Sequence, residues 1–327
     1  MTESLRPMNL GGILDRTLRI YRSRFPAFVG LALIPVLAAE LIEFADKTWP
    51  HLSSLAHPVG RFENFLWNTV VSLCFYNVFC VIGDTIEPGI VKLASSSTLG
   101  EDCSMISSLR FIALRWRSYV WIAVLKVCVV LVIPELVYVA LLIGAVSLGE
   151  AVRPSGQQPQ LVTPLLSLLA DGVGVGLFFW LGACQSLSIP AAALENITGL
   201  GSIRRSWSLS KGTRLRIWFV WIVLWAATWV LAWVLEYLLS QLMLLAGNML
   251  HLADLMRSLY GPAVLILVTG IYAVLGPILP IALTLFYYDQ RIRNEGFDIE
   301  RMMESAGLNT AETLHAQASE ATTPQAG

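Results

Sequence analysis

The chain is long enough for one or two soluble domains, but its composition excludes water as the main solvent. Of its 327 residues, 56% are hydrophobic and 14% are charged, and the mean hydropathy is +0.65, whereas a soluble domain carries about 25% charged residues. The formal net charge of -1 excludes a strongly basic nucleic-acid-binding protein, so we expect no nucleic-acid partner.

Six apolar segments follow one another along the chain, and each is long enough to cross hydrocarbon at about 1.5 Å of rise per residue. Their approximate bounds are 27–46, 66–91, 118–148, 162–194, 216–245 and 262–288. They predict an all-α, polytopic domain of six transmembrane helices over residues 27–293. The segment 1–26 precedes this domain, and the polar stretch 294–327, without apolar period, is typical of a disordered tail.

Lys and Arg residues are distributed unequally between the connections, and this distribution predicts the topology. They gather before the first apolar segment and after each even one: Arg6, Arg16, Arg19, Arg22, Arg24, Lys92, Arg110, Arg115, Arg117, Arg204, Arg205, Lys211, Arg214, Arg216, Arg291, Arg293 and Arg301. The opposite connections hold Lys47, Arg61, Arg153 and Arg257. Because basic residues favour the cytoplasmic side, we expect both termini in the cytoplasm.

The basic connections also show helical periodicity. In the first, apolar residues recur at spacings of three and four while arginines occupy the other face, which predicts an amphipathic helix along the inner membrane surface. Each such helix precedes two apolar segments, so we expect three repeats of a surface helix and a helical hairpin, at about 8–95, 103–196 and 199–293. Contacts with anionic lipids are expected for Arg16, Arg19, Arg22, Arg110, Arg117, Arg204 and Arg205.

Three blocks of sequence point to a family. They are LRPMNLGGILDRT at Leu5–Thr17, RSWSLSKG at Arg205–Gly212 and FYYDQRIRNEGFD at Phe286–Asp298. In wording and order they resemble the bacterial glycerophosphoryl diester phosphodiesterase membrane-domain family, and the resemblance covers most of the chain. It implies a multi-pass protein of the bacterial inner membrane. Some members of that family add a soluble phosphodiesterase barrel, for which this chain leaves no length, so we expect no enzymatic activity.

Charged residues within membrane spans are costly and are therefore candidates for function. Lys126 in the third segment and Asp171 in the fourth fall at overlapping depth. We expect them to form a structural ion pair between neighbouring helices, with a proton or ion relay as the alternative. Carboxylates also recur in the outer parts of the odd segments, at Glu40, Glu43, Glu135 and Glu236. They predict either an acidic vestibule that collects cations or side chains that reach the outer interface.

An aromatic stripe runs along the fifth segment at spacings of three and four, formed by Trp218, Trp221, Trp225, Trp229 and Trp233. Interfacial Trp is needed only at the ends of a span. A stripe over the full depth indicates either a packing seam between helices or a groove for lipid chains.

The sequence shows no motif for catalysis, metal binding or a cofactor. His51, His57 and His251 all fall on the outer side without metal-ligand spacing, and no nucleotide-binding or nucleophile motif is present. We therefore expect no catalytic residues, no metal and no cofactor. The leading hypothesis is a non-enzymatic membrane module that binds lipid, with anionic lipid favoured, or a protein partner. The alternatives are a transporter or export component that uses intramembrane charges and, less favoured, an enzyme acting on phosphodiester lipids.

Overall fold

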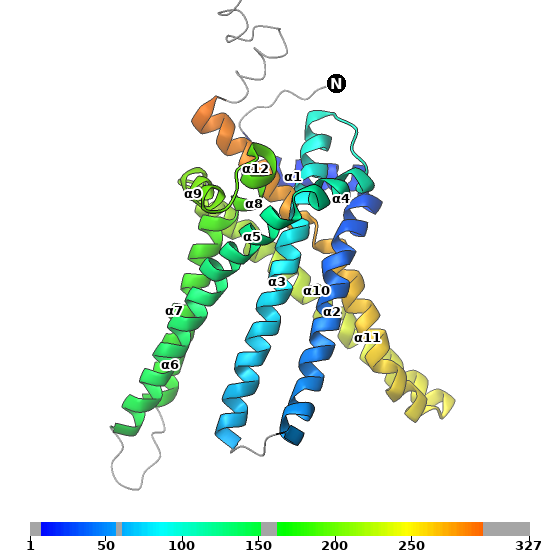
Figure 1. The fold of residues 1–327 in the computed structure, drawn as a ribbon. Coiled ribbons are helices and arrows are strands. Elements are labelled where there is room, and N and C mark those ends of the chain that lie inside the picture. Colours follow the sequence, from blue (N-terminus) through cyan, green and yellow to red (C-terminus); the bar gives the residue numbers. More distant parts are fainter. Residues whose placement is uncertain (1–7, 57–60, 152–161, 297–327) are drawn as a thin grey trace, which may run out of the picture.

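The structure, a computed structural model, describes residues 8–56, 61–151 and 162–296. Every regular element within these residues is a helix (Figure 1). In chain order they are α1 (Leu10–Ser23), α2 (Phe25–Ala56), α3 (Arg61–Leu99), α4 (Met105–Leu114), α5 (Trp116–Val127), the π-helix η1 (Cys128–Val132), α6 (Ile133–Ala151), α7 (Val162–Gln185), α8 (Ser188–Glu195), α9 (Leu200–Leu209), α10 (Arg214–Leu250), α11 (Ala253–Leu275) and α12 (Ile278–Glu295). Within the described residues, six stretches are long and apolar enough to cross a membrane, which confirms the predicted class. The predicted tail lies outside the described residues from position 297 onward.

Half of the predicted apolar segments form one uninterrupted helix each, namely α2, α3 and α10. The third segment contains the π-helical turn η1 between α5 and α6, while the fourth and sixth are broken before α8 and α12. Pro190 and Pro280 each lie in the first turn after the break. A proline there removes an N–H that has no partner within the helix, so it favours a helix start at that place.

The short helix α1 begins where its sequence provides a cap. The Asn9 side chain accepts a hydrogen bond from the backbone N–H of Gly12 at 2.7 Å, which satisfies one of the free donors of the first turn. Its buried face consists of Ile13, Thr17, Ile20 and Tyr21. This face packs against α12, so protein rather than lipid receives most of the predicted apolar side.

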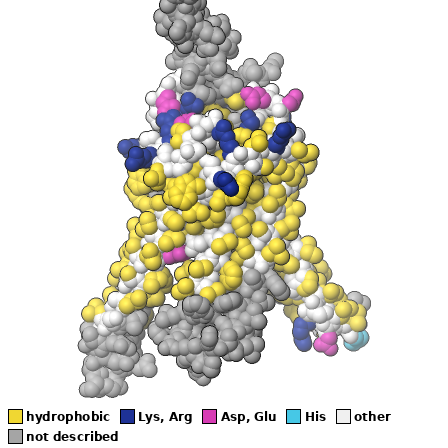
Figure 2. All heavy atoms as spheres, viewed as in Figure 1, with side chains coloured by type: hydrophobic (Ala, Val, Ile, Leu, Met, Phe, Trp, Pro, Cys, Tyr) yellow, Lys and Arg dark blue, Asp and Glu magenta, His cyan; other side chains and the backbone are white. Residues whose placement is uncertain are grey.

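The hydrophobic core lies at one end of the molecule, which we name the packed end. There α1, α8, α9 and α12 pack around the adjoining parts of α2, α3 and α10 (Figure 1). The helix α12 is the centre of this end, and its residues Ile281–Gln290 are almost all buried. Lys and Arg side chains gather on the surface of the same end in Figure 2. The helices of the basic connections thus also pack against the hydrophobic core.

The remaining lengths of the spans form three helical hairpins, α2 with α3, α6 with α7, and α10 with α11. The hairpins diverge toward the end where their helices turn, which we name the open end (Figure 1). Long apolar side chains are widely exposed there, for example Leu41 at 72%, Leu168 at 66% and Ile266 at 73%. Exposed apolar side chains on this scale are typical of a surface that faces lipid. The order of a short helix followed by two long ones occurs three times, and repetition of the sequence itself stays a prediction.

Candidate functional site: a cavity between the first hairpin and α10–α12

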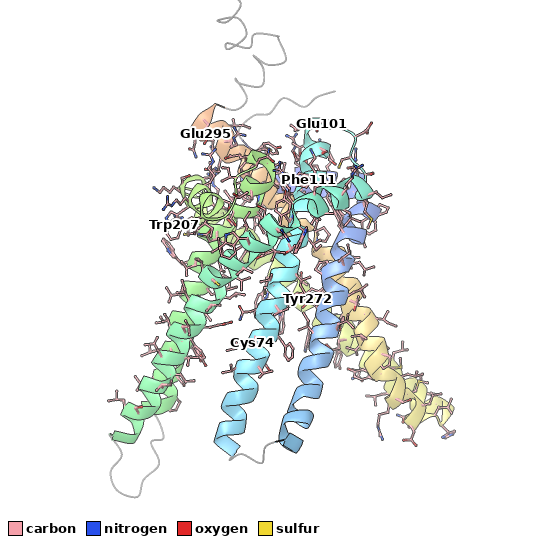
Figure 3. All side chains as sticks on the ribbon, viewed as in Figure 1. Cys74, Glu101, Phe111, Trp207, Tyr272 and Glu295 are labelled. Atoms are coloured by element: carbon pink, nitrogen blue, oxygen red, sulfur yellow. The ribbon has the colours of Figure 1, made fainter. Side chains whose placement is uncertain are left out.

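A cavity of about 810 Å³ lies between the first hairpin and the last three helices. This volume is within the range of small-molecule pockets, which is about 300–1,000 Å³. Figure 3 labels Tyr272 of α11, which lies between α2 and α3 in this view and belongs to the lining. The lining comprises Ala32, Pro35, Val36, Ala39, Glu40, Ile42, Ser72, Phe75, Tyr76, Phe79, Gly83, Ile86, Glu87, Ile90, Trp225, Trp229, Val268, Tyr272, Gly276, Leu279 and Pro280.

The cavity is lined mainly by aliphatic and aromatic side chains, which belong to the spanning parts of several helices. On α2 the lining runs from Ala32 to Ile42, a length of about 15 Å along the helix, roughly half the thickness of the hydrocarbon core. Gly83 of α3 contributes to the space, because a Cβ added there would meet nothing within 4 Å. Trp225 and Trp229 are each more than half exposed, at 61% and 57%, so the cavity is open along α10.

Two carboxylates interrupt this apolar surface. Glu40 accepts a hydrogen bond from the Thr269 hydroxyl at 3.1 Å. Glu87 is 9% exposed, and its Oε1 has no hydrogen-bond partner in the part of the chain that the structure describes. None of the described lining residues is Lys, Arg or His. The side chains of the described lining that can carry a charge at neutral pH are therefore two carboxylates, and Glu87 retains an oxygen without a described hydrogen-bond partner.

Glu87 also belongs to a buried charge cluster between α3 and α5. The Lys126 Nζ donates to Asp84 Oδ1 at 2.7 Å and to Glu87 Oε2 at 3.5 Å. The three side chains are between 11% and 17% exposed. The expected Lys126–Asp171 pair is therefore not the one that forms. Asp171 is exposed on α7, where it lies beside Tyr138 of α6.

Asp84 and Glu87 are functional candidates that the sequence analysis missed. They lie three residues apart within the second apolar segment, which places them on one face of a helix. That spacing is a signal available in the sequence alone. The sequence does not show that this face turns toward α5 rather than α7, because that depends on the order of helices in space.

The four carboxylates of the predicted acidic vestibule do not share one site. Glu40 lines the cavity, whereas Glu135 accepts hydrogen bonds from the Asn77 side chain of α3 at 3.2 and 3.4 Å. Glu236 is partly buried on α10 and is absent from the described lining, and the side chain of Glu43 lies outside the described residues. A single vestibule is thus replaced by separate hydrogen bonds of Glu40 and Glu135 with neighbouring helices.

The aromatic stripe of α10 divides into three parts with different surroundings. Trp218 packs edge to face on Phe179 with ring centroids 5.4 Å apart, and Trp221 packs near Phe178 and over Gly182 of α7. This part is a packing seam. The next two tryptophans of the stripe, Trp225 and Trp229, have ring centroids 5.6 Å apart, and both line the cavity. Further toward the open end, Trp233 is stacked on Tyr237 and is 66% exposed.

One of the arginines expected to contact lipid is committed to protein contacts instead. Arg205 of α9 binds Glu195 of α8 through two hydrogen bonds of 2.8 Å and Glu295 of α12 at 2.7 Å. Hydrogen bonds to Glu295 and Glu195 raise the pKa of Arg205 above its usual value. The Tyr287 hydroxyl also donates to Glu195 at 2.8 Å. Arg205 therefore joins three helices of the packed end, and its predicted role at the membrane surface is not supported.

The other predicted lipid-contact arginines remain accessible to different degrees. Arg19 pairs with Asp15 on an exposed face, and Arg16 is partly buried beside Met8. The more exposed members of the set are Arg22, Arg110, Arg117 and Arg204. These four residues lie on four different helices, α1, α4, α5 and α9, and place positive charge around the packed end. Contact with anionic lipid stays a prediction for these residues.

Among the described residues, no group of three His, Cys, Asp or Glu side chains could hold a metal ion. No protein-family model, curated protein or solved structure matches the chain. The resemblance to the phosphodiesterase membrane-domain family therefore stays a prediction from the three sequence blocks. The cavity and its two carboxylates are the features from which a function has to be argued.

Proposed function

We propose that this protein is a non-enzymatic membrane module that binds a lipid-like amphiphile in the cavity between the first hairpin and α10–α12. The observation that carries the proposal is a cavity of about 810 Å³ with apolar and aromatic walls inside the spanning part of the chain. Pockets of this size and lining bury most of the surface of a small apolar ligand. The buried carboxylate of Glu87 supplies a polar group that orients such a ligand.

The opening of the cavity supports entry from the bilayer. The half-exposed rings of Trp225 and Trp229 form a lining on α10 that is accessible from outside the protein. Because the surrounding helix surfaces are apolar, a ligand dissolved in hydrocarbon reaches this wall without crossing water. A water-soluble ligand has no comparable route at this depth.

We further propose that the packed end faces the cytoplasm of a bacterium and that the protein resides in the inner membrane. The exposed Arg22, Arg110, Arg117 and Arg204 support this orientation, because basic residues favour the cytoplasmic side and anionic lipid head groups. Cysteine substitutions test it, with Arg110→Cys at the packed end and Arg257→Cys at the open end. A membrane-impermeant thiol reagent applied to intact cells should label only the second variant, and labelling of the first would refute the orientation.

Filling the cavity tests the proposed binding. Gly83→Phe introduces a ring where a Cβ meets nothing within 4 Å, so it should occupy the cavity without disturbing a packed neighbour. We expect the purified variant to lose at least about ten-fold in affinity for a long-chain amphiphile, measured by equilibrium dialysis in detergent with protein-free micelles subtracted.

The matched control is Gly172→Phe on α7, which is exposed and has equally open surroundings. It adds the same ring to another span and should leave the affinity unchanged. Equal binding by the parent chain and both variants would show that the cavity is not the binding site.

A transporter is the second candidate function, and one observation favours it. The Lys126, Asp84 and Glu87 cluster touches the cavity through Glu87 and so links buried charge to the proposed ligand site. Charged groups in this arrangement occur in coupled transport pathways. Proteoliposomes that move a labelled amphiphile across the bilayer, and stop doing so in Asp84→Asn, would replace simple binding with transport.

A further inference from the structure

The charge of the cavity distinguishes between classes of amphiphile. Glu40 and Glu87 both line it, and no described lining residue carries a positive side chain. An anionic head group placed there would meet two carboxylates at low dielectric, where like charges repel strongly. Arg22, Arg110, Arg117 and Arg204, which suit anionic lipid, lie around the packed end instead.

Glu87 also has an unsatisfied bonding requirement. It is 9% exposed, and its Oε1 has no described hydrogen-bond partner, whereas its Oε2 receives the longer of the two Lys126 contacts, at 3.5 Å. A buried acceptor without a donor costs about 1–3 kcal/mol and more when it is charged. The group that completes this carboxylate must therefore donate a hydrogen bond.

The charge cluster favours a positive donor. Lys126 brings one ammonium group against the two carboxylates of Asp84 and Glu87, so one negative charge remains uncompensated when all three are ionised. Such a charge is costly within hydrocarbon. A hydroxyl group would satisfy Oε1 but would leave the charge, whereas an ammonium group would satisfy both.

The aromatic lining fits the same ligand. Trp225, Trp229, Tyr76 and Tyr272 all contribute to the cavity. The faces of such rings attract cations, most strongly for Trp, and the attraction increases when water is excluded. The aliphatic side chains between them accommodate the apolar remainder of the molecule.

We propose that the ligand of this cavity is a lipophilic cation, an amphiphile with a primary ammonium group that donates to the Glu87 carboxylate while its chain lies along α2 and α10. This inference rests on the proposed function and narrows it to one class of amphiphile. Glu40 is a second carboxylate in the same lining. The cavity is thus selective in charge, and its preference is opposite to that of the basic surface at the packed end.

The test compares an alkylammonium, an alkanol and an alkanoate of equal chain length at neutral pH, where an aliphatic amine is protonated. Equilibrium dialysis in detergent measures the affinity of each for the purified full-length chain. We expect the affinity for the alkylammonium to be at least about ten-fold higher than for the other two, because a hydrogen bond to a charged partner contributes enough free energy for a ten-fold change in affinity.

Three variants then locate the selectivity. Glu87→Gln keeps the shape of the side chain and should reduce the preference for the ammonium about ten-fold, and Glu40→Gln should reduce it less. Glu135→Gln is the matched control, because Glu135 bonds to Asn77 outside the described lining, and it should keep the full preference. A circular dichroism melt of each variant confirms that it is folded.

The outcomes separate this inference from the proposed function. Equal binding of the three amphiphiles that Gly83→Phe abolishes would refute the cation preference and leave the binding function intact. An ammonium preference that survives in both Glu87→Gln and Glu40→Gln would refute the role of these carboxylates. No binding of any of the three, or binding that Gly83→Phe leaves unchanged, would refute the proposed function as well.

Discussion

The packed end and the cavity each hold a buried carboxylate, and the two carboxylates differ in their hydrogen bonds. At the packed end, Asp289 is fully buried and accepts from the backbone N–H of Met8 at 2.7 Å and from Arg293 at 2.8 Å. Between the hairpins, Glu87 is nearly as buried and retains an oxygen without a described partner. A buried carboxylate with donors keeps its hydrogen bonds on folding, whereas one that retains an oxygen without a donor requires an explanation. We therefore expect Asp289 to contribute to stability and Glu87 to the proposed binding.

The largest expected effect comes from opening a void in the packed end. Phe286 of α12 is completely buried within the core, so Phe286→Ala should lower the free energy of unfolding by about 3–5 kcal/mol. Thermal unfolding of the purified protein in detergent measures the loss.

Phe219→Ala on α10 is the matched control for that experiment. Phe219 is 52% exposed, and its replacement creates no closed void, so it should cost less than about 1 kcal/mol. Similar losses at both positions would show that the packed end does not dominate stability.

A smaller loss is expected when the charge cluster of the spans is broken. Lys126→Met leaves Asp84 and Glu87 facing each other without a cation, which should cost about 3 kcal/mol because the carboxylates stay buried. Adding Asp84→Asn and Glu87→Gln to the same chain should restore most of the stability. Asp171→Asn tests the pairing that the sequence suggested, and a loss as large as that of Lys126→Met would contradict the observed cluster.

The smallest effect concerns Cys103, in the connection before α4. Burial alone raises the pKa of its thiol, but contacts with Ser107 at 3.2 Å and Ser108 at 3.4 Å lower it on balance. The thiolate is the reactive form, so Cys103 should react at a lower pH than an ordinary thiol.

Ser107→Ala removes the nearer of these hydroxyls and should slow the labelling of Cys103 by a thiol reagent roughly two- to five-fold at neutral pH. The rate is measured by mass spectrometry of the labelled peptide over a pH series. A pH profile identical to that of the parent chain would exclude the hydroxyl as the cause.

Much of the fold follows from the sequence because a membrane imposes local requirements. Each backbone polar group in hydrocarbon has to bond within its own helix, so a span is visible as a long apolar stretch. All six predicted segments correspond to such helices. The breaks before α8 and α12 were not predicted, although Pro190 and Pro280 lie just after them.

The candidate site was predictable only in its parts. Glu40, Trp225 and Trp229 were identified as unusual, and the structure brings them to one cavity. Lys126 was identified too, but its expected partner Asp171 lies elsewhere. Spacing along one helix shows which residues share a face, and it does not show which other helix that face meets.

The sequence by itself determined that the apolar segments are surrounded by hydrocarbon, how many spans there are, and how charge is distributed between the two ends. These properties depend on residues close together in the chain, because hydrocarbon thickness sets the length of a span. Only the tertiary structure decided that Lys126 faces α3, that α1 buries its apolar side against α12 and that the first hairpin stands apart from α10. These features arise from the packing of distant segments, and apolar spans of similar composition do not specify their neighbours.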